Sequence, residues 1–173
     1  MFFIILRFFL ILGIVSFFIY YFTIVVVPEN SIFIQERLGR YHRTLSAGFH
    51  FQFPFVDKIA YKLSGKEQTL IIKSLKCETA DGLEFSIDSV FVFQIQDPIK
   101  AVYETENYGL SILQEIQRHI IAEIHNHHSD EIFARRYGMN QSVVKHVGEQ
   151  AKNWGIKIIR FEIQQMTRNA KIT

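Results

Sequence analysis

The amino-terminal part of the chain is an uninterrupted apolar run. From Phe8 to Val27, twenty consecutive residues (FFLILGIVSFFIYYFTIVVV) carry no charged side chain. At about 1.5 Å of rise per residue, a helix of this length spans about 30 Å, the thickness of a bilayer's hydrocarbon core. A helix also satisfies its own backbone polar groups in lipid. The pattern predicts a transmembrane helix over residues 8–27, which ends before Pro28 and follows a flank at residues 1–7.

A cleaved signal peptide is the alternative interpretation of this run. Its apolar region is normally about 7–15 residues long and ends in small residues at a cleavage site. The run here is longer and ends in three valines, which favours an uncleaved anchor. Arg7 precedes the run, whereas arginines mixed with acidic residues follow it, so the membrane side of the remaining chain stays open.

Beyond Pro28, apolar residues alternate with polar ones, as in half-buried strands. In residues 49–55 (FHFQFPF), four phenylalanines alternate with His50, Gln52 and Pro54. We expect the phenylalanines to face a core and Pro54 to mark a strand end or edge. The other strands predicted in this part are residues 32–37, 41–45, 58–63 and 67–77.

A hairpin and a long strand follow. Asp81-Gly82 is typical of a tight turn with positive φ at both residues. The strand predicted next, residues 84–96, is apolar on both faces near its middle, so we expect it to be central and covered there by helices. Asp97, followed by a proline, ends this strand and is placed to cap a short helix.

The carboxyl-terminal part is predicted to be helical and to end in a strand. Apolar residues recur at helical spacing between about Tyr108 and Asn126, a new helix begins at Ser129, and a third follows Asn140. Gly155 ends the third helix, and alternation over residues 156–164 predicts the last strand. The apolar stripe of the first helix consists of Leu110, Leu113, Ile116, Ile120, Ile121 and Ile124.

Composition limits the classes of function. The chain has 19 Lys and Arg against 17 Asp and Glu, and this net charge of +2 argues against electrostatic capture of nucleic acid. The residues after the apolar run are enough for one domain with its own core. The single cysteine, Cys77, permits no intrachain disulfide, so the redox compartment stays open.

Three stretches in register resemble the stomatin, prohibitin and flotillin superfamily, also called the SPFH or band 7 domain. They are Val27–Ile59 (VPENSIFIQERLGRYHRTLSAGFHFQFPFVDKI), Asp81–Tyr103 (DGLEFSIDSVFVFQIQDPIKAVY) and Asn153–Met166 (NWGIKIIRFEIQQM). The chain looks most similar to bacterial stomatin-like proteins with an N-terminal anchor. The resemblance implies an α+β fold: a transmembrane helix, then an SPFH domain over residues 28–166 with a mostly antiparallel N-terminal sheet, C-terminal helices and a final strand.

The resemblance also implies a function. Members of the superfamily assemble into large oligomers at membranes, organise lateral membrane regions and regulate membrane proteases or channels, as in membrane protein quality control. Such proteins usually continue into a long charged coiled-coil helix, whereas residues 167–173 form a short tail here without a heptad. The expectation is a truncated member, or one that assembles through the domain alone.

The histidines are the strongest candidates for chemistry. His119, His125, His127 and His128 lie close together in sequence, with Glu123 among them. A hydrolytic zinc site would need two histidines four residues apart with a glutamate between them, and the spacing does not match. His119 and Glu123 share a helix face opposite the apolar stripe, so we expect them in solvent and predict no metal site.

The other candidate chemistries have structural interpretations. Cys77 lies at a predicted strand end, no nucleophile elbow is present, and no glycine-rich loop has the phosphate-binding spacing. A basic surface facing anionic headgroups is one possibility, although acidic residues among these cations favour an ordinary mixed-charge face. Its members would be Arg37, Arg40, Arg43, Lys58, Lys62 and Lys66.

Two functional classes therefore compete. The leading hypothesis is a non-enzymatic scaffold in a membrane, predicted to be a bacterial inner membrane, with the lipid bilayer, itself and other membrane proteins as partners. It predicts no catalytic residue, cofactor, metal, nucleic acid or small-molecule substrate. The alternatives are a membrane-tethered metal-dependent hydrolase that uses the His119–His128 cluster, or a remnant that folds without assembling.

Overall fold

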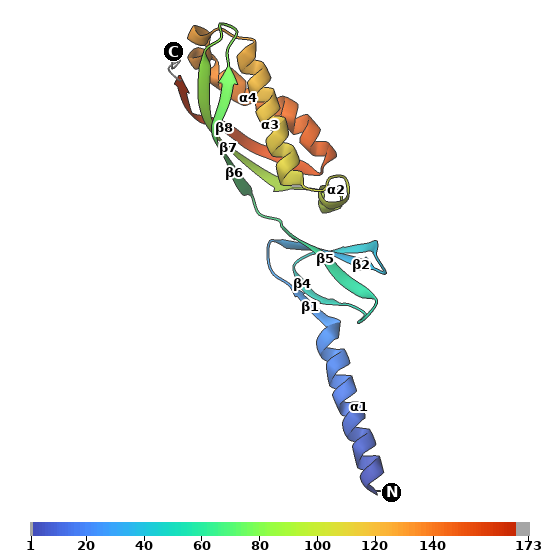
Figure 1. Ribbon diagram of the computed structural model, residues 1–173. Coiled ribbons are helices and arrows are strands. Elements are labelled where there is room, and N and C mark those ends of the chain that lie inside the picture. The colour runs from blue at the N-terminus through green and yellow to red at the C-terminus, as the bar shows by residue number, and fades with distance from the viewer. Residues whose placement is uncertain (1, 169–173) are drawn as a thin grey trace. The chain divides into compact units, whose positions relative to one another are not determined.

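The chain divides into two compact units, residues 1–64 and residues 65–173. The computed structural model describes residues 2–168, apart from the side chains of residues 2 and 18–22 (Figure 1). Met1 and residues 169–173, most of the predicted tail, lie outside the described residues.

The first unit begins with a helix that is offset from the predicted one. Helix α1 covers Phe2–Thr23, and residues Ile24–Val27 form strand β1. The predicted end of the helix at Val27 is therefore wrong: four consecutive β-branched residues favour a strand. Strand β1 pairs antiparallel with β4, Gly48–Phe51, so that Val26 lies opposite Phe49. Within the described part of the chain, no helix combines the length and the apolar character needed to cross a membrane.

A three-stranded antiparallel sheet completes the first unit. Its strands are β2 (Ser31–Arg37), β3 (Arg40–Leu45) and β5 (Asp57–Ser64), with β2 in the centre. These bounds agree with the predicted strands to within a few residues. The apolar core is small: Val27, Phe33 and Leu45 are buried together, with Val25 and Ile59 packed against them.

The second unit has two layers, a sheet and a pair of helices (Figure 1). The antiparallel strands are β6 (Gln68–Glu78), β7 (Glu84–Ile95) and β8 (Ile156–Arg168), with β7 in the centre as predicted. Between β7 and β8 lie α2 (Pro98–Tyr103), α3 (Tyr108–His125) and α4 (Ser129–Asn153). Helix α3 packs on β6 and α4 packs on β8, and together they enclose the main core.

The helices differ from the prediction in two respects. Helix α4 continues through Asn140 as one helix, because the Asn140 side chain accepts a hydrogen bond from the Ile163 N–H of β8 at 3.0 Å instead of capping a new helix. The buried stripe of α3 is Ile112, Ile116, Ile120 and Ile124, whereas Leu110 and Ile121 are exposed. Asp97 caps α2 as expected, accepting from the Ile99 and Lys100 N–H groups.

The helices cover only one face of the central strand. Phe85, Ile87, Phe91, Phe93 and Ile95 are buried, whereas Val90 and Val92 on the opposite face are half-buried. The expectation that both apolar faces would be covered is therefore wrong. Valine is favourable in strands even on a partly open face, so Val90 and Val92 do not indicate a second layer of helices.

The hairpin between β6 and β7 is wider than predicted. The Gly82 N–H bonds to the Thr79 carbonyl at 2.9 Å, and of Asp81 and Gly82 only Gly82 has positive φ, at +73°. This turn directs the Asp81 carboxylate to the start of α4, where it accepts from the Ser129 N–H at 3.2 Å and the Ser129 hydroxyl at 2.6 Å. A residue of the hairpin therefore caps α4, whose own N-cap residue, His128, makes no side-chain capping bond.

Candidate interaction surfaces

The alternating phenylalanines of the first unit face outward. Phe49, Phe51, Phe53 and Phe55 are all exposed, Phe49 by 79% and Phe55 by 99%, whereas the intervening His50 and Gln52 are half-buried. The sequence interpretation of these phenylalanines as core residues is wrong. Val26 of β1 is exposed as well and lies opposite Phe49. We call Val26 and these four phenylalanines the aromatic face.

Polar contacts hold the aromatic face in this orientation. Strand β4 is joined to β3 by the Arg43 guanidinium, which donates to the Phe51 carbonyl and to the Gln35 side-chain oxygen. After β4, Phe55 takes φ = +69°, a conformation that is rare for a bulky side chain. Such a conformation persists only where the surrounding contacts determine it. The exposure of Phe55 is therefore built into the loop.

An ion pair anchors the same loop. The Asp57 carboxylate is buried and accepts from Arg37 Nε at 2.7 Å, from Arg37 Nη2 at 3.1 Å and from the Phe53 N–H at 2.8 Å. The hydrogen bonds from Arg37, reinforced by the one from Phe53, lower the pKa of Asp57 to about 2. The Arg37 guanidinium also lies over the Phe53 ring, 5.3 Å from its centroid.

These contacts change the interpretation of the candidate basic surface. Arg37 and Arg43, two of its six proposed members, are engaged within the unit. Lys62 lies over the Phe33 ring, 5.2 Å from its centroid. Three of the six cations are therefore held by contacts within the first unit, whereas Arg40 and Lys58 are exposed and Lys66 belongs to the second unit.

The structure does not bring the four candidate histidines together. His119 projects from α3 toward α4, where its Nε2 lies 2.9 Å from the Ser142 hydroxyl and its ring lies 5.1 Å from that of His146. His125 and His128 are exposed at the end of α3 and the start of α4, and His127 lies near Glu131. Among the described residues, no group of three or more His, Cys, Asp or Glu side chains could hold a metal ion.

His119 is half-buried, which corrects its expected place in solvent. Burial lowers the pKa of His119; Glu123 opposes this shift and His146 adds to it. Sequence reasoning missed His146 because only the packing of α3 against α4 brings it next to His119. Ser142 and His146, four residues apart, already share one face of the helix predicted after Asn140, but no local signal states that this face meets His119.

Cys77 is buried in the core of the second unit, as expected of a structural thiol. Burial raises its pKa to about 11. A thiol with this pKa is almost wholly protonated near neutral pH and is a poor nucleophile.

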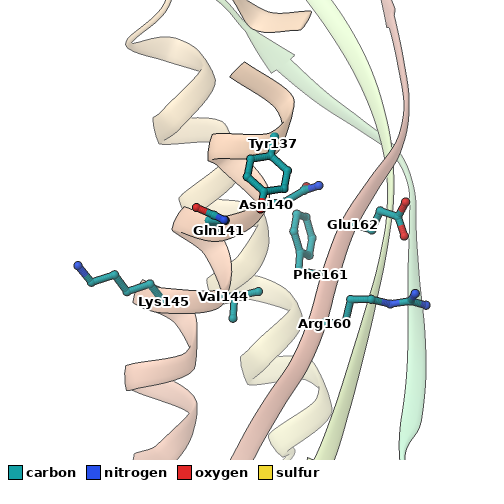
Figure 2. A pocket seen from close by; sticks show the side chains of 8 residues that line it. All are labelled: Tyr137, Asn140, Gln141, Val144, Lys145, Arg160, Phe161 and Glu162. Carbon is teal, nitrogen blue, oxygen red and sulfur yellow. The ribbon is translucent and has the colours of Figure 1, made fainter. Parts of the chain in front are cut away.

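A groove runs between α4 and the outer edge of β8, and Figure 2 shows one end of it. This end is a hollow of about 490 Å³, lined by Tyr137, Val144 and Lys145 of α4 and by Arg160, Phe161 and Glu162 of β8. In Figure 2, Phe161 lies on the α4 side of β8, whereas Arg160 and Glu162 extend from the strand away from α4. A second hollow, of about 480 Å³, shares Val144 and Lys145 and continues past Gly148 to Lys152 and Lys157. The two hollows therefore follow the same helix and the same strand.

The SPFH domain / Band 7 family matches residues 25–173, which include β1 except Ile24 and every strand and helix after it. The chain belongs to this family. The match covers both units, so the aromatic face and the groove are features of an SPFH chain.

Similar proteins include mitochondrial and bacterial members. Human "Stomatin-like protein 2, mitochondrial" is 32% identical over 144 residues, 83% of this chain and 40% of the relative. The Caenorhabditis elegans "Stomatin-like protein stl-1" is 27% identical over 84% of this chain and 45% of its own length. An uncharacterized Mycobacterium tuberculosis protein is 26% identical over 83% of this chain and 38% of its own length. The SPFH chain spans about two fifths of these relatives.

Proposed function

We propose that this protein is a non-enzymatic membrane-associated scaffold of the stomatin type, whose first unit lies against lipid. The observation that carries the proposal is the aromatic face. Soluble monomeric proteins rarely expose several adjacent large apolar side chains without a partner. The transfer of outward-facing phenylalanines from water to a lipid surface lowers the free energy of the system, and so favours membrane binding.

Helix α1 supports the same assignment. Every described large apolar side chain of α1, from Phe3 to Phe17, is exposed. A helix that is apolar on all sides is stable only when it is surrounded by protein or lipid. We assign α1 as the element held in the lipid. Because β1 follows α1 directly and pairs with β4, chain connectivity keeps the aromatic face close to that membrane.

The second part of the proposal concerns partners. We infer that the protein associates with itself and organises other membrane proteins, such as proteases or channels. Membership of the SPFH family supports this inference. The separated histidines do not favour the metal-dependent hydrolase. We propose a bacterial inner membrane as the location, as predicted from the sequence.

Flotation with phosphatidylcholine vesicles tests the role of the aromatic face. The comparison is between the full chain and a variant with Phe49, Phe51 and Phe55 replaced by serine, all three of which are exposed. Both chains keep α1, so the lipid concentration is made limiting and the partition coefficient is compared. We expect that of the variant to fall by at least about tenfold, because about 2 kcal/mol of transfer free energy is lost for each phenylalanine that enters lipid. A matched variant, Leu110→Ser with Tyr137→Ser, removes exposed apolar side chains of the second unit and should bind like the parent chain.

Two further measurements separate the parts of the proposal. Alkaline carbonate washing of membranes should leave the full chain in the pellet, and its release would overturn the assignment of α1 to the lipid. Crosslinking in native membranes should give oligomers, and a strictly monomeric chain would overturn self-association. A triple serine variant that floats like the parent would overturn only the role of the aromatic face.

A further inference from the structure

The outer edge of β8 offers backbone hydrogen-bonding groups to a further strand. Strand β8 is the last strand of its sheet and pairs only with β7 among the described residues. The Ile163 N–H and carbonyl point away from β7, where they bond to the Asn140 and Arg136 side chains of α4. Hydrogen-bonded pairs alternate along an antiparallel ladder, so Phe161, two residues earlier, presents its N–H and carbonyl on the same outer side.

The open part of this edge is about six residues long. The Gly155 carbonyl bonds inward to the Gln96 N–H at 2.9 Å, so the alternation directs the backbone groups of Ile156 and Ile158 outward. Among the described residues, the hydrogen bonds from α4 to the backbone of β8 reach only Ile163 and Gln164. The pairing with β7 shifts at Ile159, so the outward groups of Ile156 and Ile158 lie on one side of a bulge and those of Phe161 on the other. Residues 156–161, at about 3.3 Å each, therefore leave an edge of at most about 20 Å for an added strand.

The two hollows lie along this open edge. Val144 and Tyr137 provide apolar surface on the α4 side (Figure 2). At Gly148 an added Cβ would meet no atom within 4 Å, so the groove has free space there. Alternate side chains of an added strand would enter this space, and the others would lie on the open face of the sheet beside Lys157 and Arg160.

The charge of the groove selects the occupant. Its lining includes the cations Lys145, Lys152, Lys157 and Arg160, against two anions, Glu149 and Glu162. None of these six forms an ion pair within the described part of the chain. A second copy would bring the same net positive edge against this one, which costs free energy, whereas carboxylates would complement it.

We propose that this groove binds an extended acidic segment of another protein, which adds a fourth strand to the outer edge of β8. Acidic side chains of the segment pair with Lys157 and Arg160, and its alternate apolar side chains pack against Val144 and Tyr137. This is β-strand addition: the backbone ladder supplies affinity and the alternating side chains supply specificity. The proposal does not depend on lipid binding by the first unit.

The test uses the full chain in detergent micelles and a fluorescein-labelled seven-residue peptide of alternating Glu and Val. Fluorescence anisotropy should show binding that weakens as salt rises, because exposed charges are screened. Two matched peptides separate the contributions: Lys in place of Glu removes the charge complementarity, and N-methylated Val removes backbone donors. Both should bind at least about tenfold more weakly. Equal binding of the N-methylated peptide would overturn strand addition.

Variants locate the site. Arg160→Glu and Lys157→Glu, at exposed positions of β8, should each weaken binding about tenfold. Gly148→Leu should also weaken binding, because the leucine side chain fills the second hollow. Leucine has a higher helix propensity than glycine, so the substitution should not disrupt α4. Lys76→Glu, exposed on β6, is the matched control and should bind like the parent.

Two further kinds of outcome would overturn the proposal. One is the absence of binding, or equal binding by Arg160→Glu and the parent chain. The other is a dimer in sedimentation experiments that Arg160→Glu or Gly148→Leu dissociates, because that result assigns the groove to a second copy. Vesicle flotation of the same variants should not change, which separates this failure from failure of the proposed lipid contact.

Discussion

Strand β7 and the segment 49–55 carry the same sequence pattern but have opposite environments. Both alternate phenylalanine with smaller or polar residues. In β7 the alternation faces the helices, and Phe85, Phe91 and Phe93 are almost completely buried, whereas Phe49 and Phe51 are exposed in the first unit. Alternation therefore identifies a face of a strand, and the layer packed against it decides whether that face is a core.

The two units also differ in what stabilises them. The second unit has a core of eighteen buried residues, built largely from β7, β8 and two helices. The first unit has three buried residues in its cluster and relies on polar contacts such as Arg37–Asp57. We therefore expect apolar truncation to affect mainly the second unit, and loss of polar contacts to affect mainly the first.

The largest contrast should come from two matched truncations. Phe91→Ala should lower the free energy of unfolding by about 3–5 kcal/mol, because it leaves a cavity in a packed core. Phe51→Ala removes an exposed ring and should change it by no more than about 0.5 kcal/mol. Urea unfolding of both variants in detergent, followed by circular dichroism, measures the difference. Equal losses would contradict the assignment of the two faces.

Removing the Asp57 charge should have the next largest effect. Asp57→Asn weakens the bonds to Arg37 and the Phe53 N–H, and should shift the unfolding equilibrium of the first unit about tenfold. A tryptophan introduced at exposed Phe53 can report that unit, in a Trp154→Phe background. Lys58→Gln, the exposed neighbour of Asp57, is the control and should leave the equilibrium unchanged.

Acid should reveal the same ion pair. The folded-state pKa of Asp57, about 2, lies below its ordinary value of 3.8. The unfolded chain therefore binds more protons between these values, so the stabilisation is complete above about pH 4 and is lost as pH falls toward 2. Asp57→Asn should lack this part of the acid dependence. An unchanged acid profile in the variant would show that the pair does not contribute.

Loss of the shared cap of α4 should have a smaller effect. Asp81→Ala leaves the Ser129 N–H and hydroxyl without their acceptor, and should shift the unfolding equilibrium of the second unit a few-fold. Glu84→Ala, at an exposed position of the same hairpin, serves as the control. Amide hydrogen exchange should localise the loss of protection in Asp81→Ala to the first turn of α4.

The smallest effect should come from the histidine contact between α3 and α4. Burial lowers the pKa of His119 in the folded state. As pH falls below about 6.5, this imidazole is therefore protonated in the unfolded chain at a higher pH than in the folded chain. Stability of the second unit should therefore be complete above that pH and decline below it. His119→Gln should reduce the decline, whereas His125→Gln, at an exposed position, should retain it. Urea midpoints at pH 7.5 and 5.5 measure the difference.

Much of the fold could be predicted because local signals agreed with the final packing. Alternation located β2, β3, β5, β6 and β7, Asp97 located the start of α2, and helical spacing located α3. These elements have core faces or caps that their own residues specify. The family, too, followed from stretches whose turns and strands are local features.

The errors arose where distant residues decide the outcome. Asn140 was interpreted as a helix break, but its side chain bonds to β8, more than twenty residues away. Asp81 was interpreted as a turn residue with positive φ, but it caps a helix that starts at Ser129. The aromatic face was misassigned because no local signal states which side of a strand the rest of the protein covers.

The single cysteine of the chain is chemically silent. Cys77 is 4% exposed and its pKa is raised to about 11, so at neutral pH only about one thiol in ten thousand is ionised. Maleimide reagents should therefore not modify Cys77 in the folded native chain. A cysteine introduced at Phe55 could be labelled selectively without first removing Cys77, which gives spectroscopists a ready attachment point on the aromatic face.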